Sequence, residues 1–176
     1  MEIELPKKEE RDNPLLIPVS VTISVLAVFI AGVTLLGHRQ ATDRVLLNSE
    51  AFNQWSYYQA KNGRLNMTEG FAYMVEKIPP ADPKTAAEMH EHYAKAIAKY
   101  EADKEEIAAE AKKLEAERDK AARRENHFHA GEGLLEIGLI ICSMTLLTDR
   151  KLFWYSGMIV GAIGVLVASG AFLLVH

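Results

Sequence analysis

Residues that could do chemistry gather at two distant places in the sequence. His38 stands in the first third, and His127, His129, Glu132 and Glu136 follow one another much later. Imidazoles and carboxylates could hold a divalent ion or relay protons to Glu136. The spacing is poor for a metal, because His127 and His129 lie about 200° apart around a helix. We therefore predict neither a metal site nor a cofactor, and His38, His127, His129 and Glu132 are only weak metal candidates.

Other signatures of catalysis are missing from the sequence. It has no nucleophile beside a base, no glycine-rich phosphate loop and no basic patch suited to nucleic acid. Its single cysteine, Cys142, lies in an apolar run, which excludes an internal disulfide and a cysteine metal site. We predict that the protein is not an enzyme and does not bind nucleic acid.

The elements that must position these groups begin with three apolar segments. Residues 15–36 and 152–175 carry no charge, and each run exceeds the roughly 20 residues that cross a bilayer. The third segment, 131–148, is short and contains Glu136. A full crossing counted back from Thr148 places Glu136 about 10 Å inside the boundary. Such a carboxylate either reaches water near the headgroups or marks a proton or cation path.

The segment between the first two spans, 37–130, is rich in charge and should be exposed to water. Prolines within 78–83 remove backbone donors and break the helix, which leaves arms at about 38–77 and 84–130. Arms of similar length that both end at the membrane predict an antiparallel hairpin.

Both arms show the alternating steps of three and four residues that are typical of coiled coils. On the returning arm the stripe comprises Met89, Tyr93, Ala96, Tyr100, Asp103 and Ile107, followed by Ala111, Leu114, Arg118, Ala121, Glu125 and Phe128. On the outgoing arm it comprises Asn48, Ala51, Trp55, Tyr58, Asn62 and Leu65, and then, in a shifted register, Met67, Phe71, Met74 and Ile78.

Aromatic residues of the outgoing arm are too many for one seam. Phe52 and Tyr57 lie off the stripe that contains Trp55 and Tyr58. They are either spare surface beside an ordinary hairpin core or the contact for a second helix, from another subunit or another protein. These four aromatic residues are the candidate interaction site.

Glycines mark a face of the last span. Gly157, Gly161 and Gly164 would let another helix approach closely. That helix could belong to this chain's own spans, but three helices offer limited internal surface, so we expect a homo-oligomer.

Several stretches together resemble a known family. They are Gly37-His38, residues 53–61, which include Trp55, and residues 147–155, where Leu147-Thr148 leads into Arg150, Lys151 and Phe153-Trp154-Tyr155. This pattern resembles the bacterial membrane-protein family known as domain of unknown function 4337. The resemblance implies a small bacterial inner-membrane protein with a span, a hairpin and two further spans, and it implies no activity.

The predicted fold class is an all-α membrane protein with three transmembrane helices and a long extramembrane antiparallel helical (coiled-coil) hairpin between the first and second. The predicted parts are an N-terminal tail 1–14, a first span 15–36, a hairpin 37–130, a second span 131–148, a short loop 149–151 and a third span 152–175. The Pro-rich turn of the hairpin is 78–83.

Orientation follows from positive residues in short loops. Lys7, Lys8, Arg11, Arg150 and Lys151 favour a cytoplasmic N-terminus and a periplasmic hairpin. The opposite orientation is favoured by arginines that flank the hairpin, namely Arg39, Arg44, Arg123 and Arg124.

The predicted function is a membrane-anchored structural or protein-interaction subunit, in contact with the lipid bilayer, that forms homo-oligomers and presents its hairpin to a protein partner. The alternative is a small ion- or proton-conducting oligomer that uses the intramembrane carboxylate Glu136.

Overall fold

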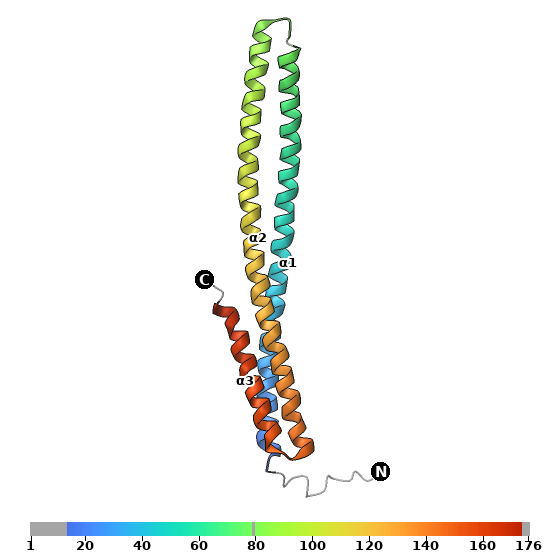
Figure 1. Ribbon diagram of the computed structural model, residues 1–176, viewed down its shortest axis with the longest axis vertical. Helices are drawn as coiled ribbons and strands as arrows, with labels where there is room; N and C mark the ends of the chain where they lie inside the picture. The colour runs from blue at the N-terminus through green and yellow to red at the C-terminus, as the bar shows by residue number, and fades with distance from the viewer. Residues whose placement is uncertain (1–13, 79, 174–176) are drawn as a thin grey trace, which may run out of the picture. The chain divides into compact units, whose positions relative to one another are not determined.

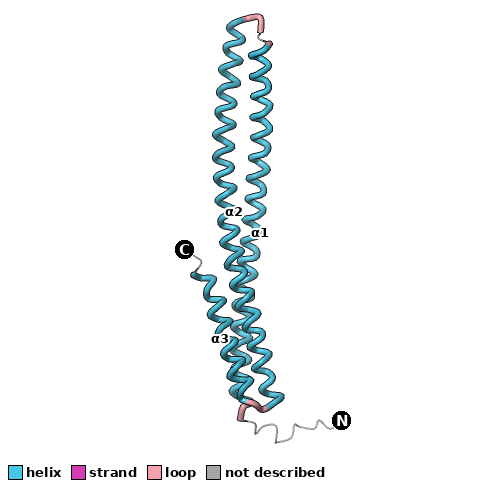
Figure 2. The backbone as a smooth tube through the Cα atoms, viewed as in Figure 1, coloured by secondary structure: helices cyan, strands magenta, loops and turns pink. Residues whose placement is uncertain are grey.

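The computed structural model describes residues 14–78 and 80–173. These residues form three α-helices and no strand: α1 (Leu16–Lys77), α2 (Pro83–Thr148) and α3 (Lys151–Leu173) (Figures 1 and 2). The prediction of an all-helical chain is confirmed. Most of the predicted tail, 1–14, with its lysines at 7 and 8 and its arginine at 11, lies outside the described residues, as do Pro79 and the last residues of the predicted third span.

The turns between the helices follow from local chemistry. Helix α1 ends just before the Pro79-Pro80 pair, and Asp82 caps the start of α2. The Asp82 carboxylate accepts hydrogen bonds from the Thr85 hydroxyl at 2.6 Å and from the Thr85 backbone N–H at 3.1 Å. Asp149 ends α2 with a φ of 54°, a left-handed conformation that Asp tolerates better than most side chains.

The described residues divide into two compact units. Unit 1 combines the residues up to Asp43 with those from Lys120 onward, and unit 2 comprises Arg44–Asp119. Helices α1 and α2 contribute to both units, whereas α3 belongs to unit 1 alone.

Unit 1 is held together by close packing of α2 against α3. A Cβ atom on Gly138 would lie 2.8 Å from the backbone oxygen of Gly157 and 2.9 Å from the nitrogen of Gly161. Backbone atoms cannot move aside cheaply, so a side chain at this position would separate the helices. The buried core around this contact consists of Leu26, Val33, Phe128, Leu135, Cys142, Ala168 and Ala171.

All three helices contain a stretch that is long and apolar enough to cross a membrane. In α1 and α2 this stretch occupies only part of the helix, because each also runs through unit 2. The chain therefore has the helical segments expected of a membrane protein.

Unit 2 pairs the C-terminal part of α1 with the N-terminal part of α2. Asn48 contacts Arg118, and Lys61 contacts Asp103. Residues later in α1 thus contact residues earlier in α2, so the two helix segments run in opposite directions.

Candidate interaction surface

The inner face of α1 in unit 2 packs against α2. Ala51 and Leu65 are buried, and Trp55, Tyr58 and Asn62 are half-buried. These residues belong to the first part of the predicted stripe, from Asn48 to Leu65, in which only Asn48 is exposed. On α2 every predicted stripe residue from Met89 to Arg118 is buried or half-buried. Residues that share the inner face of each helix thus form the contact within unit 2.

Two of the predicted interaction aromatics belong to this inner face. Trp55 donates its Nε1–H to a carboxylate oxygen of Glu115 at 2.9 Å, and its ring meets that of Tyr58 edge-on at 5.5 Å. The Lys104 ammonium lies 5.3 Å from the centre of the Tyr58 ring. Trp55 and Tyr58 therefore hold α1 to α2.

A charged pair crosses the same face. Lys61 Nζ lies 2.6 Å from a carboxylate oxygen of Asp103, and its side chain is only 12% exposed. The hydrogen bond from Lys61 lowers the pKa of Asp103, and the same bond raises the pKa of Lys61. The ammonium also lies between the rings of Tyr57 and Tyr100, at 5.4 and 5.5 Å. Covered charges with a matched partner fix the pairing of the two helices.

The outer face of α1 has a different character, because large apolar side chains stay exposed there. Phe52 is 70% and Tyr57 51% exposed. The prediction that the seam against α2 continues through Met67, Phe71, Met74 and Ile78 is wrong, because all four side chains are exposed. Their exposed fractions are 63%, 48%, 56% and 76%, in that order.

The physical reason is that the inner register continues without a shift. Thr68 and Ala72 are half-buried and Val75 is buried, at steps of three and four residues from Leu65. Gly63 and Gly70, where a shift was expected, lie inside α1 and have open space around them.

The exposed side chains of α1 have a periodicity of their own. Alternating steps of three and four residues connect Tyr57, Ala60, Arg64, Met67, Phe71, Met74 and Ile78, all of which are exposed. We name these seven residues the outer stripe. Phe71 also stacks against Tyr93 of α2, with ring centres 6.4 Å apart, so it stands at the edge of the helix pair. The spacing is that of a coiled-coil seam, and all seven side chains stay exposed, although Phe71 also contacts α2.

The candidates for chemistry lie in unit 1, and the structure does not bring them all together. His127 packs beside Gly170 of α3, whereas His129 packs beside Gly37 of α1. His38 is exposed. Within residues 14–78 and 80–173, no three His, Cys, Asp or Glu side chains are placed to hold a metal ion.

His129 instead lies between two carboxylates of its own helix. Its Nδ1 is 3.3 Å from Glu132 and its Nε2 is 3.7 Å from Glu125. Glu132 also accepts a hydrogen bond from the Thr34 hydroxyl. This small polar cluster joins α1 to α2 beside the apolar core of unit 1.

Glu136 lies on the outside of unit 1. It is exposed beside Ile137 and Ile140, which are 50% and 58% exposed, and it has no hydrogen bond or ion pair with any described residue. A Cβ atom on the nearby Gly133 would meet no atom within 4 Å. The carboxylate is therefore not enclosed by the three helices of its own chain.

The glycine face of α3 is used inside the chain. Gly157, Gly161 and Gly164 are all buried. Gly157 packs against Cys142 and Gly138, and Gly164 packs against Leu135. This arrangement leaves the three glycines covered by α2 and by Leu26 of α1, so they offer no free face for a second copy.

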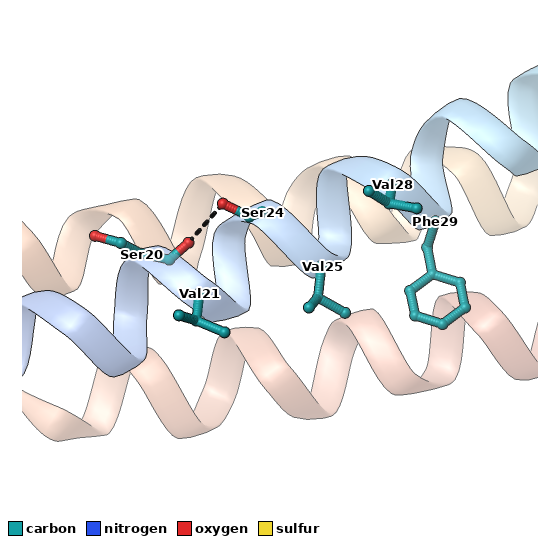
Figure 3. A pocket seen from close by; sticks show the side chains of 6 residues that line it. All are labelled: Ser20, Val21, Ser24, Val25, Val28 and Phe29. Atoms are coloured by element: carbon teal, nitrogen blue, oxygen red, sulfur yellow. Dashed lines mark hydrogen bonds between the residues drawn. The ribbon is translucent and has the colours of Figure 1, made fainter.

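Unit 1 also has two apolar hollows on its surface. A groove of about 560 Å³ lies between α1 and α3, bounded by Val25 and Phe29 on one side and by Met158 and Val165 on the other. A hollow of about 420 Å³ runs along α1 (Figure 3), where Ser20 and Ser24 are its only polar residues and Ser24 donates its hydroxyl to the backbone oxygen of Ser20. Apolar outer surfaces of this kind suit contact with lipid.

Fold and surface together define a class: an all-helical protein whose three helices could each cross a membrane and whose α1 has one face packed inward and one left open. The chain belongs to the family described as Domain of unknown function (DUF4337), whose model matches residues 15–174. The resemblance seen in the sequence is thereby confirmed. No curated protein and no solved structure matches the chain.

Proposed function

We propose that the protein is a membrane-anchored interaction subunit that works as an oligomer. In this proposal the apolar stretches of the three helices anchor it in a bacterial inner membrane. The helix pair of unit 2 is an extramembrane coiled-coil hairpin that presents its outer stripe to a partner helix. The observation that carries the proposal is the exposure of Tyr57, Met67, Phe71, Met74 and Ile78 at coiled-coil spacing.

Exposed apolar stripes are energetically unfavourable in water. A helix that faces only solvent usually has a polar outer face, and contiguous apolar patches of several hundred Å² mark binding surfaces. Met67 and Met74 are seven residues apart, as are Phe71 and Ile78, so each pair lies on one line along the helix. A second helix lying along α1 would cover both lines together.

The test uses a photocrosslinking residue placed singly in native membranes. At Met67 the probe lies on the outer stripe, whereas at Asn66, which is also exposed, it lies about 100° away. We expect a crosslinked protein from position 67 and none from position 66. Equal capture at both positions, or no capture at either, would exclude a specific partner on this surface.

The proposed orientation places the N-terminus in the cytoplasm and the hairpin in the periplasm. It is tested with a membrane-impermeant thiol reagent on intact cells whose outer membrane has been made permeable. We expect labelling of Lys84→Cys, at the start of α2, and none of Arg150→Cys, in the loop before α3. The reverse pattern would support the opposite orientation.

A second candidate function is favoured by the position of Glu136. An exposed carboxylate on an apolar helix would be kept away from lipid if several copies turned this face toward a shared water-filled path. The measurement is proton or cation flux into liposomes that contain the purified protein. We expect Glu136→Gln to abolish flux and Glu132→Gln to serve as the matched control; unchanged flux in Glu136→Gln would remove this candidate.

A further inference from the structure

We infer that the occupant of the outer stripe is a second copy of this chain, whose α1 lies parallel to the first and in the same register. This inference rests on the proposed function and names the partner for that same surface.

Insertion in the membrane orients the copies. Copies that share one topology leave the bilayer on the same side, so their α1 helices run in the same direction. Equivalent residues then stand at equal heights above the membrane. Outer stripes with identical spacing can therefore meet residue for residue, with Met67 opposite Met67 and Met74 opposite Met74.

The surface also has a suitable shape. Beside the large side chains runs a line of small residues at seven-residue spacing, comprising Ser56, Gly63 and Gly70. All three are exposed, and a Cβ atom on Gly63 or Gly70 would meet nothing within 4 Å. The large side chains of one copy can extend over the small residues of the other, which makes the surface complementary to itself.

The exposed area of the stripe is most of what a standard interface needs. Five large side chains of the stripe are between 48% and 76% exposed. With about 200 Å² of surface for a large side chain, they offer about 600 Å² per copy. A standard interface buries about 800 Å² per partner. Contacts from the small residues and from the flanks of the stripe would supply most of the remainder.

Arg64 distinguishes a second copy from an unrelated partner. It is exposed in the middle of the stripe and has no ion pair with any described residue. In a parallel pair two Arg64 guanidinium groups face one another and repel, and their long side chains must bend away from the seam. Replacing Arg64 with leucine should therefore strengthen a pair of identical copies, whereas it should weaken binding to an acidic partner.

The experiment is disulfide crosslinking, in native membranes, of variants that each add one cysteine to the chain. The native Cys142 is fully buried, so the unaltered chain is the background control. Met67→Cys and Met74→Cys should form covalent dimers on mild oxidation. The matched variants Asn66→Cys and Tyr73→Cys, each one residue earlier and exposed, should form at least tenfold less. Adding Arg64→Leu to Met67→Cys should raise the dimer yield.

The outcomes separate this inference from the proposed function. Dimers from the stripe variants alone, with a higher yield after Arg64→Leu, support a second copy. Equal dimer yields from all four positions would indicate random collision and overturn the inference. If the photocrosslinker at Met67 instead captures a different protein while Met67→Cys forms no dimer, the second copy is excluded and the proposed interaction surface stands. Absence of both products overturns both.

Discussion

The two helix segments of unit 2 pack against each other but have different outer surfaces. The segment from α1 has many exposed large apolar side chains between Val45 and Ile78. The described segment of α2 from Pro83 to Asp119 has no exposed large apolar side chain. On this segment of α2 the large apolar residues lie on the inner face, and the exposed residues are mainly alanine, lysine and glutamate. A helix with one large apolar face, like α2 in unit 2, can bury that face against a single neighbouring helix. Helix α1 carries a second apolar line, which the first neighbour does not cover.

The largest expected effect separates the inner face of α1 from its outer stripe. Leu65 is 5% exposed, so Leu65→Ala should lower the free energy of unfolding by about 2 to 5 kcal/mol. Met67→Ala, two residues later and 63% exposed, should change it little. Thermal unfolding followed by circular dichroism in dilute detergent, where copies are separated, measures both. Similar losses for the two variants would contradict the division of α1 into two faces.

The next effect tests whether only α1 needs a partner. Met67→Gln combined with Met74→Gln should reduce photocrosslinking from Phe71 in native membranes at least tenfold, because the apolar contact is lost. The matched change on α2, Ala94→Gln with Ala98→Gln, alters two exposed residues and should leave capture unchanged. If the α2 variant lost capture equally, the partner would contact both helices and the asymmetry would not explain binding.

A smaller effect concerns the aromatic residues that belong to the inner face. Trp55→Phe keeps most of the ring but removes the hydrogen bond to Glu115, so we expect a loss of about 0.5 to 1.5 kcal/mol in the free energy of unfolding. Tyr73→Phe, at a side chain that is 61% exposed, is the control and should have no measurable effect. If Trp55→Phe lost partner capture but kept its stability, Trp55 would instead belong to the interaction surface.

Much of the fold follows from the sequence because it rests on local patterns. The prolines around 78–83 break the helix, and the charge-free runs identify the apolar stretches of α1 and α3. The inner stripe of α2 was predicted residue by residue, because α2 offers only one apolar line in unit 2. Helix α1 offers two lines, and periodicity alone does not say which one faces α2. For this reason the predicted inner stripe is correct as far as Leu65 but then follows the outer line, beginning at Met67.

The candidate site was harder to predict for the same reason. Sequence spacing separates His127 from His129 correctly, since their directions depend only on the helix. Whether Gly161 faces the chain's own α2 or another copy depends on which helices meet, and whether Glu136 points inward or outward depends on how α2 is rotated in unit 1. Both are set by packing between distant segments. The signal that could have revealed the outer stripe was the exact repeat of seven from Met67 to Met74 and from Phe71 to Ile78, on a line that the inner stripe does not share.

The smallest expected effect, which concerns the charged pair between the two helices, depends on pH. The pKa of Asp103 is lowered by Lys61, so its carboxylate stabilises the fold above the ordinary Asp pKa of about 4 and stops doing so as pH falls through its lower folded value. The pKa of Lys61 is raised, so its ammonium stabilises the fold below the ordinary Lys pKa of about 10.4, and this contribution is lost only as pH rises through the higher folded value. We therefore expect Asp103→Asn to lower the melting temperature between about pH 4 and pH 10, and we expect this deficit to shrink steadily as the pH falls further below 4. Glu101→Gln, at an exposed position two residues earlier, should have no such pH-dependent effect. A deficit in Asp103→Asn that did not shrink as the pH fell below about 4 would show that packing, and not charge, joins the inner face of α1 to α2 at this point.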